Sequence, residues 1–450
     1  MDLNEVMNTI IDGKDFDVDN AEHKALLSQL LSFSRTERIE YKKMYEYYKG
    51  NTDAINNYKI ITKRSNLKAN VNYLKKFIKE EVSYSVGNRL TYDCDNQEMA
   101  KSLIYNMQHW DENHDEDLMK YMLIFTKAFE VYYIKDGKEF CSDIISPLEG
   151  YAYCDKKGNP IIFIHEWAEK LDTSKTYIDV YTRNKVFHLD SSLNEAKKAD
   201  SHRFGEVPVS VGILTKEGVD DSLYKDVKGL QDALETNLSD IANEIADFRN
   251  AYLLFKGCKI DKEGLEKAKE LGIMQTGDSK SNIEWLIKNI NDTFIQNALD
   301  RYVDTLYQIT CHVNHNEKLQ SNLSSLALRS RLIALENKCT LNINSHKNVV
   351  KKRLRLLCRF LNYPTNKGYD DRSITVKYTP NIPQDDLMMA QTISQLADGT
   401  ISKATARAQF SFINNPAKEK ELCEEEMKQE LDLMGDDYMK EPGASGGLDE

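Results

Sequence analysis

A long amphipathic helix is predicted for DALETNLSDIANEIADFRNAYLLFKG, residues 232–257. Its apolar residues recur at spacings of 4, 3, 4, 3 and 4, which form one stripe along an α-helix: Leu234, Leu238, Ile241, Ile245, Phe248 and Tyr252. Asp240, Glu244 and Asp247 lie at helical spacing on another face, and no Lys or Arg stands among them. The sequence therefore predicts a helix with an apolar stripe and an acidic face that lacks basic neighbours along the chain.

The same apolar spacing recurs further along the chain. The first helix is expected to occupy residues 223–252, a length of about 45 Å. A second helix is expected over 293–313, with this stripe: Ile295, Leu299, Tyr302, Leu306, Ile309 and Val313. The residues between the two helices, 253–292, indicate a small αβ segment with a short helix over 262–271 and the strands GIMQ and IEWLI.

A polar loop and a very long helix are predicted next. The segment NHNEKLQSNLS, residues 314–324, has no hydrophobic periodicity and is expected to be a loop. Helical spacing then extends over 325–363, with this stripe: Leu328, Leu332, Leu335, Cys339, Val350, Leu354, Leu357 and Leu361. Basic residues crowd the second half of this helix: Lys347, Lys351, Lys352, Arg353, Arg355 and Arg359.

Residues 31–222 combine helical and strand patterns. Two helices are predicted in RTERIEYKKMYEYYKG, which Gly50 ends, and in NVNYLKKFIKEEVSYSVGN. Short β-rich runs then alternate with turn sequences such as KDGKEF and KKGNP, which favours an antiparallel sheet with helices packed on it. Residues 1–30 are polar and weakly patterned, and we expect them to form an N-terminal arm.

The last part of the chain is expected to be mostly helical. SITVKYTP predicts one strand within residues 364–383. Short helices follow over 384–430, where Gly399 ends one helix and Ser402 caps the next. Residues 431–450 are expected to form a flexible acidic tail. The predicted fold class is α+β, predominantly helical.

Composition narrows the possible functions. The 450 residues carry a net charge of −12, with 60 Lys and Arg against 72 Asp and Glu, which argues against a broad basic surface for nucleic acid. The eight cysteines are scattered without a C-x-x-C pair, so we expect them to be reduced and mostly structural. No apolar run approaches the length that spans a bilayer, and MDLNEVMNTI does not resemble a signal peptide, so we expect an intracellular protein, or one assembled inside a cell, with no membrane partner.

The sequence gives no positive sign of an enzyme. It contains no phosphate-binding loop and no G-x-G-x-x-G, G-x-S-x-G or H-E-x-x-H motif. Cys311, His312 and His315 lie close together, but no second ligand cluster accompanies them, so a metal site there is disfavoured. We predict no catalytic residue, metal or cofactor. A nucleic-acid-processing enzyme whose Asp and Glu clusters bind Mg²⁺ stays open as an alternative.

Several short motifs occur in a distinctive order. They are YKKMYEYYKG, SNLKANVNYLKKFIKEEVSYSVGNRLTYD, HRFGEVPV, DVKGLQDALETNLSDIANEIADFRNAYLLFKG, NLSSLALRSRLIALENK and LADGTISKATARAQFSFINNPAKEKELCEEE. Together they resemble the portal proteins of tailed bacteriophages, of the type found in long-tailed phages of Gram-positive hosts. The resemblance covers roughly residues 30–430.

The resemblance implies the parts of a portal fold. They are a wing (31–222, joined by a return strand within 364–383), two stem helices (223–252 and 293–313), a clip (253–292), a tunnel loop (314–324), a long helix (325–363) and a helical crown (384–430).

The resemblance also implies a function. About twelve copies would form a ring at one capsid vertex, the channel for packaging and ejection of double-stranded DNA. The implied partners are the terminase large subunit, head–tail connector or adaptor proteins, and the major capsid and scaffolding proteins. The protein would belong to the virion, would be assembled in the host bacterial cytoplasm, and would need no cofactor. Another head–tail adaptor or a minor capsid protein is the structural alternative.

Individual residues then receive expected roles. Asp240, Glu244 and Asp247 would face the channel and repel DNA, or else would face solvent or basic residues of a neighbouring subunit. Lys318 would lie in the tunnel loop and touch passing phosphates, or only be solvated. The bases of the long helix would contact DNA or form ion pairs. The residues expected to pack between subunits are Leu238, Ile241, Ile245 and Phe248.

Overall fold

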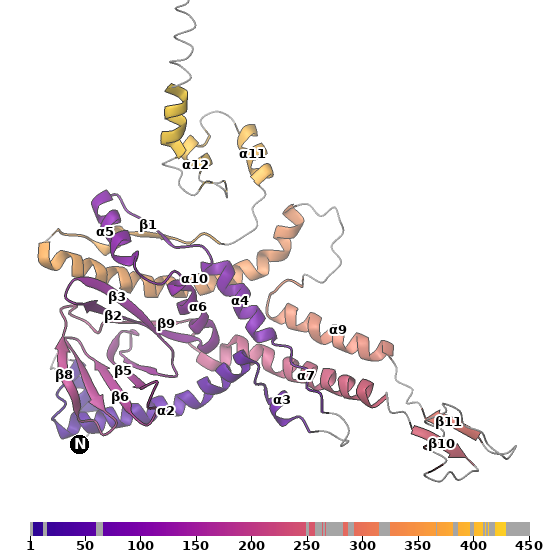
Figure 1. Cartoon of the computed structure of the whole chain (residues 1–450). Coiled ribbons are helices and arrows are strands. Elements are labelled where there is room, and N and C mark those ends of the chain that lie inside the picture. The colour runs from indigo at the N-terminus through magenta and orange to yellow at the C-terminus, as the bar shows by residue number, and fades with distance from the viewer. Residues whose placement is uncertain are drawn as a thin grey trace, which may run out of the picture. The chain divides into compact units, whose positions relative to one another are not determined.

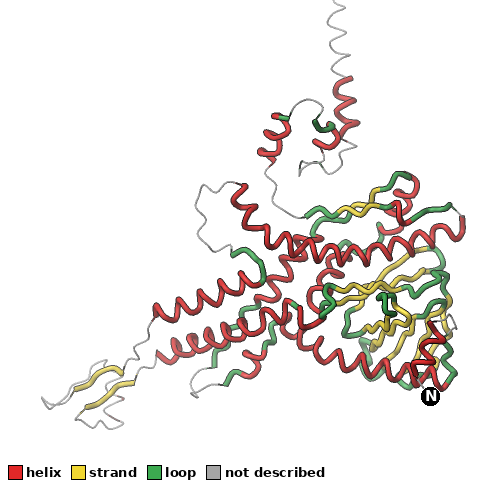
Figure 2. The backbone as a smooth tube through the Cα atoms, turned by 180° about the vertical axis from the view of Figure 1, so that it is seen from behind, coloured by secondary structure: helices red, strands yellow, loops and turns green. Residues whose placement is uncertain are grey.

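The computed structural model describes residues 3–11, 16–59, 66–248, 252–256, 263, 266, 282–286, 292–314, 325–365, 367–380, 386–396, 400–407, 410, 413 and 419–428. The chain forms two units, Met1–Asn381 and Ile382–Glu450. In the first unit, helices surround a group of β-strands (Figures 1 and 2). None of the helices within the described ranges carries an apolar stretch that could span a membrane.

The first unit contains two antiparallel sheets, of three and five strands. One has the strand order β3-β2-β9 and the other the order β4-β5-β6-β7-β8. Their strands are β2 (Lys127–Lys135), β3 (Glu139–Ile145), β4 (Gly150–Cys154), β5 (Pro160–Ala168), β6 (Thr176–Tyr181), β7 (Lys185–Asp190), β8 (Glu195–Ser201) and β9 (Val209–Ile213). Phe129 of β2 packs on Phe163 of β5, with ring centroids 5.0 Å apart, so one apolar cluster joins both sheets. The predicted antiparallel strands are confirmed.

The N-terminal residues are packed onto the five-stranded sheet. They form α1 (Leu3–Ile11) and α2 (Ala21–Lys49). Val6 and Leu27 of these helices share a buried cluster with Ile164 and Val180 of the sheet. The boundary expected at residue 30 falls inside α2, so the prediction of a separate arm is wrong: distant strands, not local periodicity, hold this segment. The predicted end of α2 is confirmed, since Gly50 has the left-handed φ of 94° that ends helices.

Helix α6 (His114–Phe125) passes directly into strand β2. Thr126 joins them with a φ of 62°, in the left-handed region that breaks a helix. Its carbonyl accepts a hydrogen bond from the backbone N–H of Leu214, at 3.0 Å, just past β9. The change from helix to strand therefore falls at Thr126.

A second apolar cluster brings together five helices of the first unit. Three further helices of this unit are α3 (Asp53–Asn57), α4 (Tyr73–Val86) and α5 (Gln97–Met107). Met44 of α2, Phe77 of α4, Phe125 of α6, Leu234 of α7 and Leu306 of α9 are all buried in the cluster. The helices that follow the sheets in sequence are thus anchored on those that precede them.

Helices α7 and α9 lie side by side, and two strands separate them in sequence (Figure 1). The bounds are α7 (Leu223–Phe248), β10 (Tyr252–Lys256), β11 (Asn282–Leu286) and α9 (Asp292–Ile309). β10 and β11 pair antiparallel, with Tyr252 opposite Leu286. The helix begins at the predicted residue, but its predicted extension to 252 is wrong, because Tyr252 belongs to a strand. The strand IEWLI is confirmed as β11, whereas the helix over 262–271 and the strand GIMQ fall almost entirely outside the described residues.

Helix α9 ends earlier than its apolar spacing predicts. Cys311 takes a left-handed φ of 63°. The N–H of His312 bonds the carbonyl of Tyr307 at 3.0 Å, and the N–H of Cys311 bonds that of Gln308 at 3.3 Å. This pair of bonds is the Schellman arrangement that closes a helix. Val313 therefore lies beyond the helix, and the predicted end at 313 is wrong.

Helix α10 (Ser325–Thr365) is the longest element, about 61 Å for 41 residues. It runs beside β9, and Val350, Leu354 and Leu357 of its predicted stripe are buried. The chain then forms strand β12 (Thr375–Lys377), which pairs antiparallel with β1 (Thr91–Asp93). The predicted strand is present. Two 3₁₀ turns, η1 (Gly218–Asp221) and η2 (Asp371–Ser373), complete the first unit.

The described part of the second unit is helical. It contains α11 (Asp386–Gln395), α12 (Lys403–Arg407) and helical residues 419–428. The Ser402 hydroxyl accepts a hydrogen bond from the backbone N–H of Thr405 at 3.1 Å, which confirms its predicted capping role. Gly399 and the predicted tail, residues 431–450, lie outside the described residues.

Candidate functional site

The acidic face of α7 begins beside another part of its own chain. Asp240 is exposed, and one of its carboxylate oxygens accepts a hydrogen bond from the Tyr58 hydroxyl at 2.7 Å. Glu244 is half-buried. Asp247 lies in the last turn of α7, but its side chain is outside the described residues. Asp240 thus keeps an exposed carboxylate while it holds the residues after α3.

The apolar stripe of α7 becomes more exposed toward the end of the helix. Leu234 is buried, and Leu238 packs against the same cluster, which includes Leu306 of α9. Ile241 is half-buried, and Ile245 is 64% exposed. The side chain of Phe248 is outside the described residues. The structure therefore brings the first predicted packing residue, Leu238, into contact with its own chain and leaves Ile245 uncovered.

A row of polar side chains on α7 binds the backbone of the segment that leads into the first turn of α4. Sequence reasoning missed this row, which we call the α7 polar ladder: Gln231, Glu235, Ser239 and Asn243, each buried. Their side-chain oxygens accept backbone N–H groups of residues 74, 71, 69 and 67, respectively, at 3.1, 3.1, 3.0 and 2.8 Å. The spacing of four residues was visible in the sequence, but such a row is also common on solvated faces.

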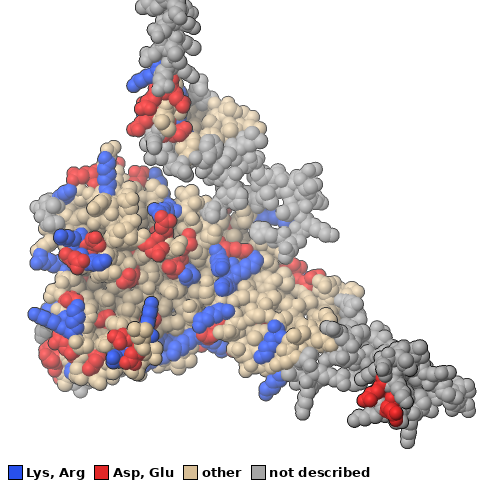
Figure 3. Space-filling model, viewed as in Figure 1, with Lys and Arg blue, Asp and Glu red and all other residues tan. Residues whose placement is uncertain are grey.

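Most of the predicted basic residues on α10 pair within the chain. The Glu206 carboxylate forms ion pairs with Arg359 at 2.6 Å, Arg355 at 3.1 Å and Lys352 at 3.6 Å. Arg353 is only 1% exposed. These pairs favour the ion-pair interpretation for four of the six bases. Of the remaining two, Lys347 lies over the Tyr378 ring, 5.3 Å from its centroid, and Lys351 is exposed. On the face shown in Figure 3, basic and acidic side chains are interspersed.

Arg353 organises a buried polar cluster between α10, α6 and β2. Its guanidinium bonds Glu130 and Asp115, each at 2.7 Å. Glu130 also lies 2.9 Å from the His114 ring and accepts a hydrogen bond from the Tyr132 hydroxyl at 2.8 Å. Burial acts to raise the pKa of Glu130, but the charges of Arg353 and His114 outweigh it and lower that pKa to about 2. The cluster holds the long helix to the three-stranded sheet.

At the end of α9, the His312 ring contacts backbone carbonyl groups. The His312 ring stacks on Phe77, with centroids 4.3 Å apart, and its two nitrogens lie 2.9 Å from the Thr310 carbonyl and 3.2 Å from the Phe77 carbonyl. Burial lowers the pKa of His312 to about 3, so the ring is neutral. His315 is outside the described residues. The structure gives His312 a packing role.

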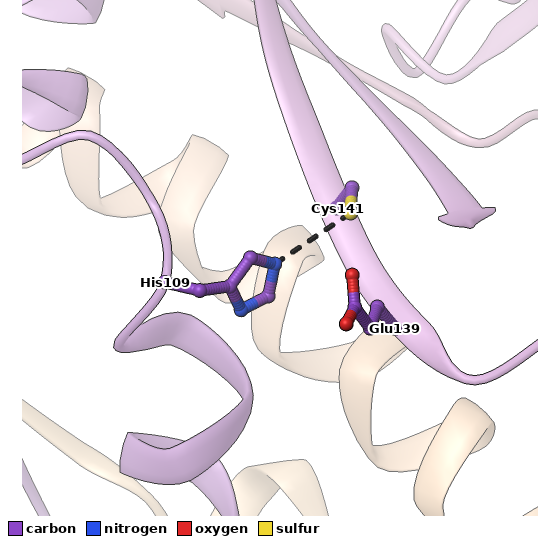
Figure 4. Close-up of side chains that lie close together, drawn as sticks. All are labelled: His109, Glu139 and Cys141. Atoms are coloured by element: carbon purple, nitrogen blue, oxygen red, sulfur yellow. Dashed lines mark hydrogen bonds between the residues drawn. The ribbon is translucent and has the colours of Figure 1, made fainter. Parts of the chain in front are cut away.

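A different group of possible metal ligands lies at the edge of the three-stranded sheet (Figure 4). It contains His109, which follows α5, and Glu139 and Cys141 of β3. Their ligand atoms all lie within 4.8 Å of one another. Sequence analysis missed the group, because His109 is 32 residues from Cys141 and forms no motif with it. The cysteines among the described residues are all free thiols: Cys94, Cys141, Cys154, Cys311, Cys339, Cys358 and Cys423.

Comparisons with known proteins test the predicted resemblance directly. The family model described as phage portal protein, SPP1 Gp6-like, matches residues 29–432. The portal protein of Bacillus phage SPP1 is 24% identical over 444 residues, which cover 91% of this chain and 85% of that protein.

Two solved structures show a more distant similarity. One is the neck of an empty gene transfer agent (GTA) particle computed with C6 symmetry, with a TM-score of 0.46 and 9% identity over 75% of this chain and 89% of that one. The other is the virion of a native gene transfer agent particle, with a TM-score of 0.43 and 11% identity over 74% and 87% of the two chains. The assignment rests on the family model, which covers the chain from α2 into the second unit, and we conclude that this chain belongs to the SPP1 Gp6-like family of phage portal proteins.

Proposed function

We propose that this protein forms a closed ring of about twelve subunits at one vertex of a phage capsid. In this role it is the channel through which double-stranded DNA is packaged and later ejected. The observation that carries the proposal is the portal family match over residues 29–432. The role is structural rather than enzymatic, it requires no cofactor, and it places the protein in the virion after assembly in the host cytoplasm.

The proposed ring assigns a task to each part of the chain. The sheets and the helices around them are the wing, α7 and α9 are the stem, and residues 253–292 are the clip. Residues 314–324 are the tunnel loop, α10 is the long helix, and residues 384–430 are the crown. The ring contacts the major capsid and scaffolding proteins, and the clip docks the terminase large subunit and later the head–tail connector.

The exposed apolar residues of the stem support a ring. Ile245 of α7 is 64% exposed and Phe294 of α9 is 69% exposed. Large apolar side chains near the ends of two long helices leave costly surface in water. A neighbouring subunit that packs on this surface would cover it. Ile241 and Phe248, on the same stripe, would complete the seam between subunits.

The acidic face of α7 supports a channel that does not hold DNA. A wall of basic residues would release counterions from each phosphate that it meets and would bind the duplex tightly. Asp240, Glu244 and Asp247 would instead repel the phosphates, so that the duplex slides. Lys318 in the tunnel loop would add one ring of positive charge, enough to resist backward slippage without a firm grip.

Electron microscopy of the purified protein in negative stain tests the ring. We expect rings with a central hole, together with a mass by light scattering of about twelve chains. A well-folded monomer at micromolar concentration, across a range of salt concentrations, would show that the ring proposal is wrong.

A clip deletion tests the docking proposal separately. Removing residues 258–290 and joining the flanking residues by a short Gly-Ser linker should leave the wing fold and its thermal transition intact. The deleted protein should no longer bind the terminase large subunit in a pull-down, while the full chain does. Retained terminase binding by the deletion would place docking elsewhere on the molecule.

A further inference from the structure

We propose that His109, Glu139 and Cys141 form a binding site for a Zn²⁺ ion at the edge of the wing sheet. The site offers an imidazole, a carboxylate and a thiol from two segments of the chain, the residues after α5 and strand β3. Figure 4 shows the His109 ring directed at Cys141, with Glu139 beside them. The proposed site does not depend on the ring or on the channel.

The backbone holds these side chains together without help from a metal. Glu139 and Cys141 are two residues apart on β3, so their side chains leave the strand on the same face. Phe140, between them, points the other way into the core. The indole N–H of Trp110 donates a hydrogen bond to the Phe140 carbonyl at 3.0 Å, which fixes the residue next to His109 against the same strand. The fold therefore sets the backbone positions of the three residues.

The distances suit a tetrahedral metal centre. A Zn²⁺ ion with a Zn–S bond of about 2.3 Å and a Zn–N bond of about 2.0–2.1 Å, at a tetrahedral angle, holds sulfur and nitrogen about 3.5–3.6 Å apart. Nε2 of His109 and Sγ of Cys141 are 3.6 Å apart. A carboxylate oxygen of Glu139 lies within 4.8 Å of both, and this side chain is exposed, so it has room to close on the ion.

The ligand set favours Zn²⁺ over the harder divalent ions. Mg²⁺ and Ca²⁺ prefer oxygen ligands, whereas one thiolate and one imidazole suit Zn²⁺. Three protein ligands leave one position for water. His109, Glu139 and Cys141 line a cavity of about 420 Å³ together with Asp143 and Tyr121. Binding displaces the thiol proton and ties the α5–α6 connection to β3, which is an edge strand of its sheet.

Cobalt substitution tests the site in the full-length protein. Reduced protein, freed of metal by dialysis, is titrated with Co²⁺ and followed by absorption spectroscopy. We expect one tight Co²⁺ per chain, with a thiolate-to-cobalt charge-transfer band and the intense visible bands of tetrahedral Co²⁺, and we expect Zn²⁺ to abolish both. Cys141→Ser should remove the charge-transfer band. His109→Ala and Glu139→Gln should each weaken binding by at least the roughly 10- to 100-fold that loss of an outer-shell partner costs.

Two matched variants control the experiment. Cys154→Ser removes a thiol from a different strand, and Glu195→Gln removes an exposed carboxylate from β8, an edge strand of the five-stranded sheet; both should bind Co²⁺ as the wild type does. His109 and Glu139 are exposed, so their variants should fold even if Cys141→Ser does not, which circular dichroism will show. The proposal would be overturned if the charge-transfer band is missing, or if it survives Cys141→Ser. The contact between His109 and Cys141 would then be only a hydrogen bond. Binding unaffected by both His109→Ala and Glu139→Gln would also overturn the proposal.

Discussion

Replacement of Arg353 by Met should destabilise the first unit strongly without any direct effect on DNA binding. Arg353 is 1% exposed and bonds Glu130, which is fully buried. Met fills much of the same volume but leaves the Glu130 carboxylate without its main counterion. Breaking a buried pair in this way typically costs about 3–5 kcal/mol.

The lowered pKa of Glu130 gives a second measure of this free-energy cost. It falls from an ordinary value of 4.5 to about 2. At about 1.36 kcal/mol for each pKa unit, the net stabilisation of the charged form, after the cost of burial, is about 3 kcal/mol. For a unit of about 380 residues, the entropy of unfolding is about 0.8 kcal/mol/K, so a loss of 3–5 kcal/mol should lower Tm by about 4–6 °C.

The effect should depend on pH in a defined direction. In the wild type the Glu130 pKa is lowered on folding, so its contribution is complete above pH 4.5 and is lost as the pH falls toward 2. In Arg353→Met, burial dominates and raises the Glu130 pKa. The variant is then penalised most at neutral pH, and the penalty shrinks as acid protonates Glu130. The difference in Tm between wild type and variant should therefore be smaller at pH 5 than at pH 7.5.

Differential scanning fluorimetry at both pH values measures these differences. The double variant Arg353→Met/Glu130→Gln removes both charges and should recover part of the lost Tm at pH 7.5. A Tm within 1 °C of the wild type for the single variant, or a difference that widens on acidification, would refute the assignment of a buried, charged Glu130.

Three further variants test the stem and the channel. Ile245→Asp would place a charge in the proposed seam, so it should shift the ring toward monomers in light scattering, and intact rings would exclude this residue from the seam. Replacing Asp240, Glu244 and Asp247 together by Lys should leave the rings intact but make them bind DNA. If about eight phosphates are neutralised, the logarithm of the affinity should fall with the logarithm of the salt concentration at a slope near −7. Salt-independent binding, or no binding, would contradict a position of these residues in the channel. Lys318→Ala should start packaging normally in a packaging assay but retain shorter DNA, whereas an unchanged packaged length would leave Lys318 without a role in slippage.

Local pattern predicted where the long helices begin, but not where α7 and α9 end. The starts of α7 at Leu223 and of α10 at Ser325 follow from apolar spacing that the structure confirms. Tyr252 keeps the helical spacing of α7, but it pairs with Leu286 in a strand, and a pairing between residues so far apart leaves no local sign. Cys311 ends α9 in a left-handed conformation that Gly usually adopts, so the sequence carried no stop signal there.

The buried and clustered side chains were the hardest features to predict. Arg353 and Glu130 are 223 residues apart in sequence, and each alone is typical of a solvated face. Their pairing depends on how α10 crosses the three-stranded sheet. The same holds for His109 and Cys141, which a loop and a strand bring together. The family resemblance, in contrast, rested on motif order along the chain, and the family match over residues 29–432 confirms it.

The α7 polar ladder should constrain the sequences of its two sides differently during evolution. It grips residues 67–74 by their backbone N–H groups, which every amino acid except proline provides. Most substitutions in that segment therefore leave the hydrogen bonds of the ladder unchanged. Gln231, Glu235, Ser239 and Asn243 have no such freedom, since each must keep a side-chain acceptor in a buried place. Among diverged relatives, the segment should drift in sequence while these four helix positions stay polar, and proline should be the one residue barred at the four gripped positions.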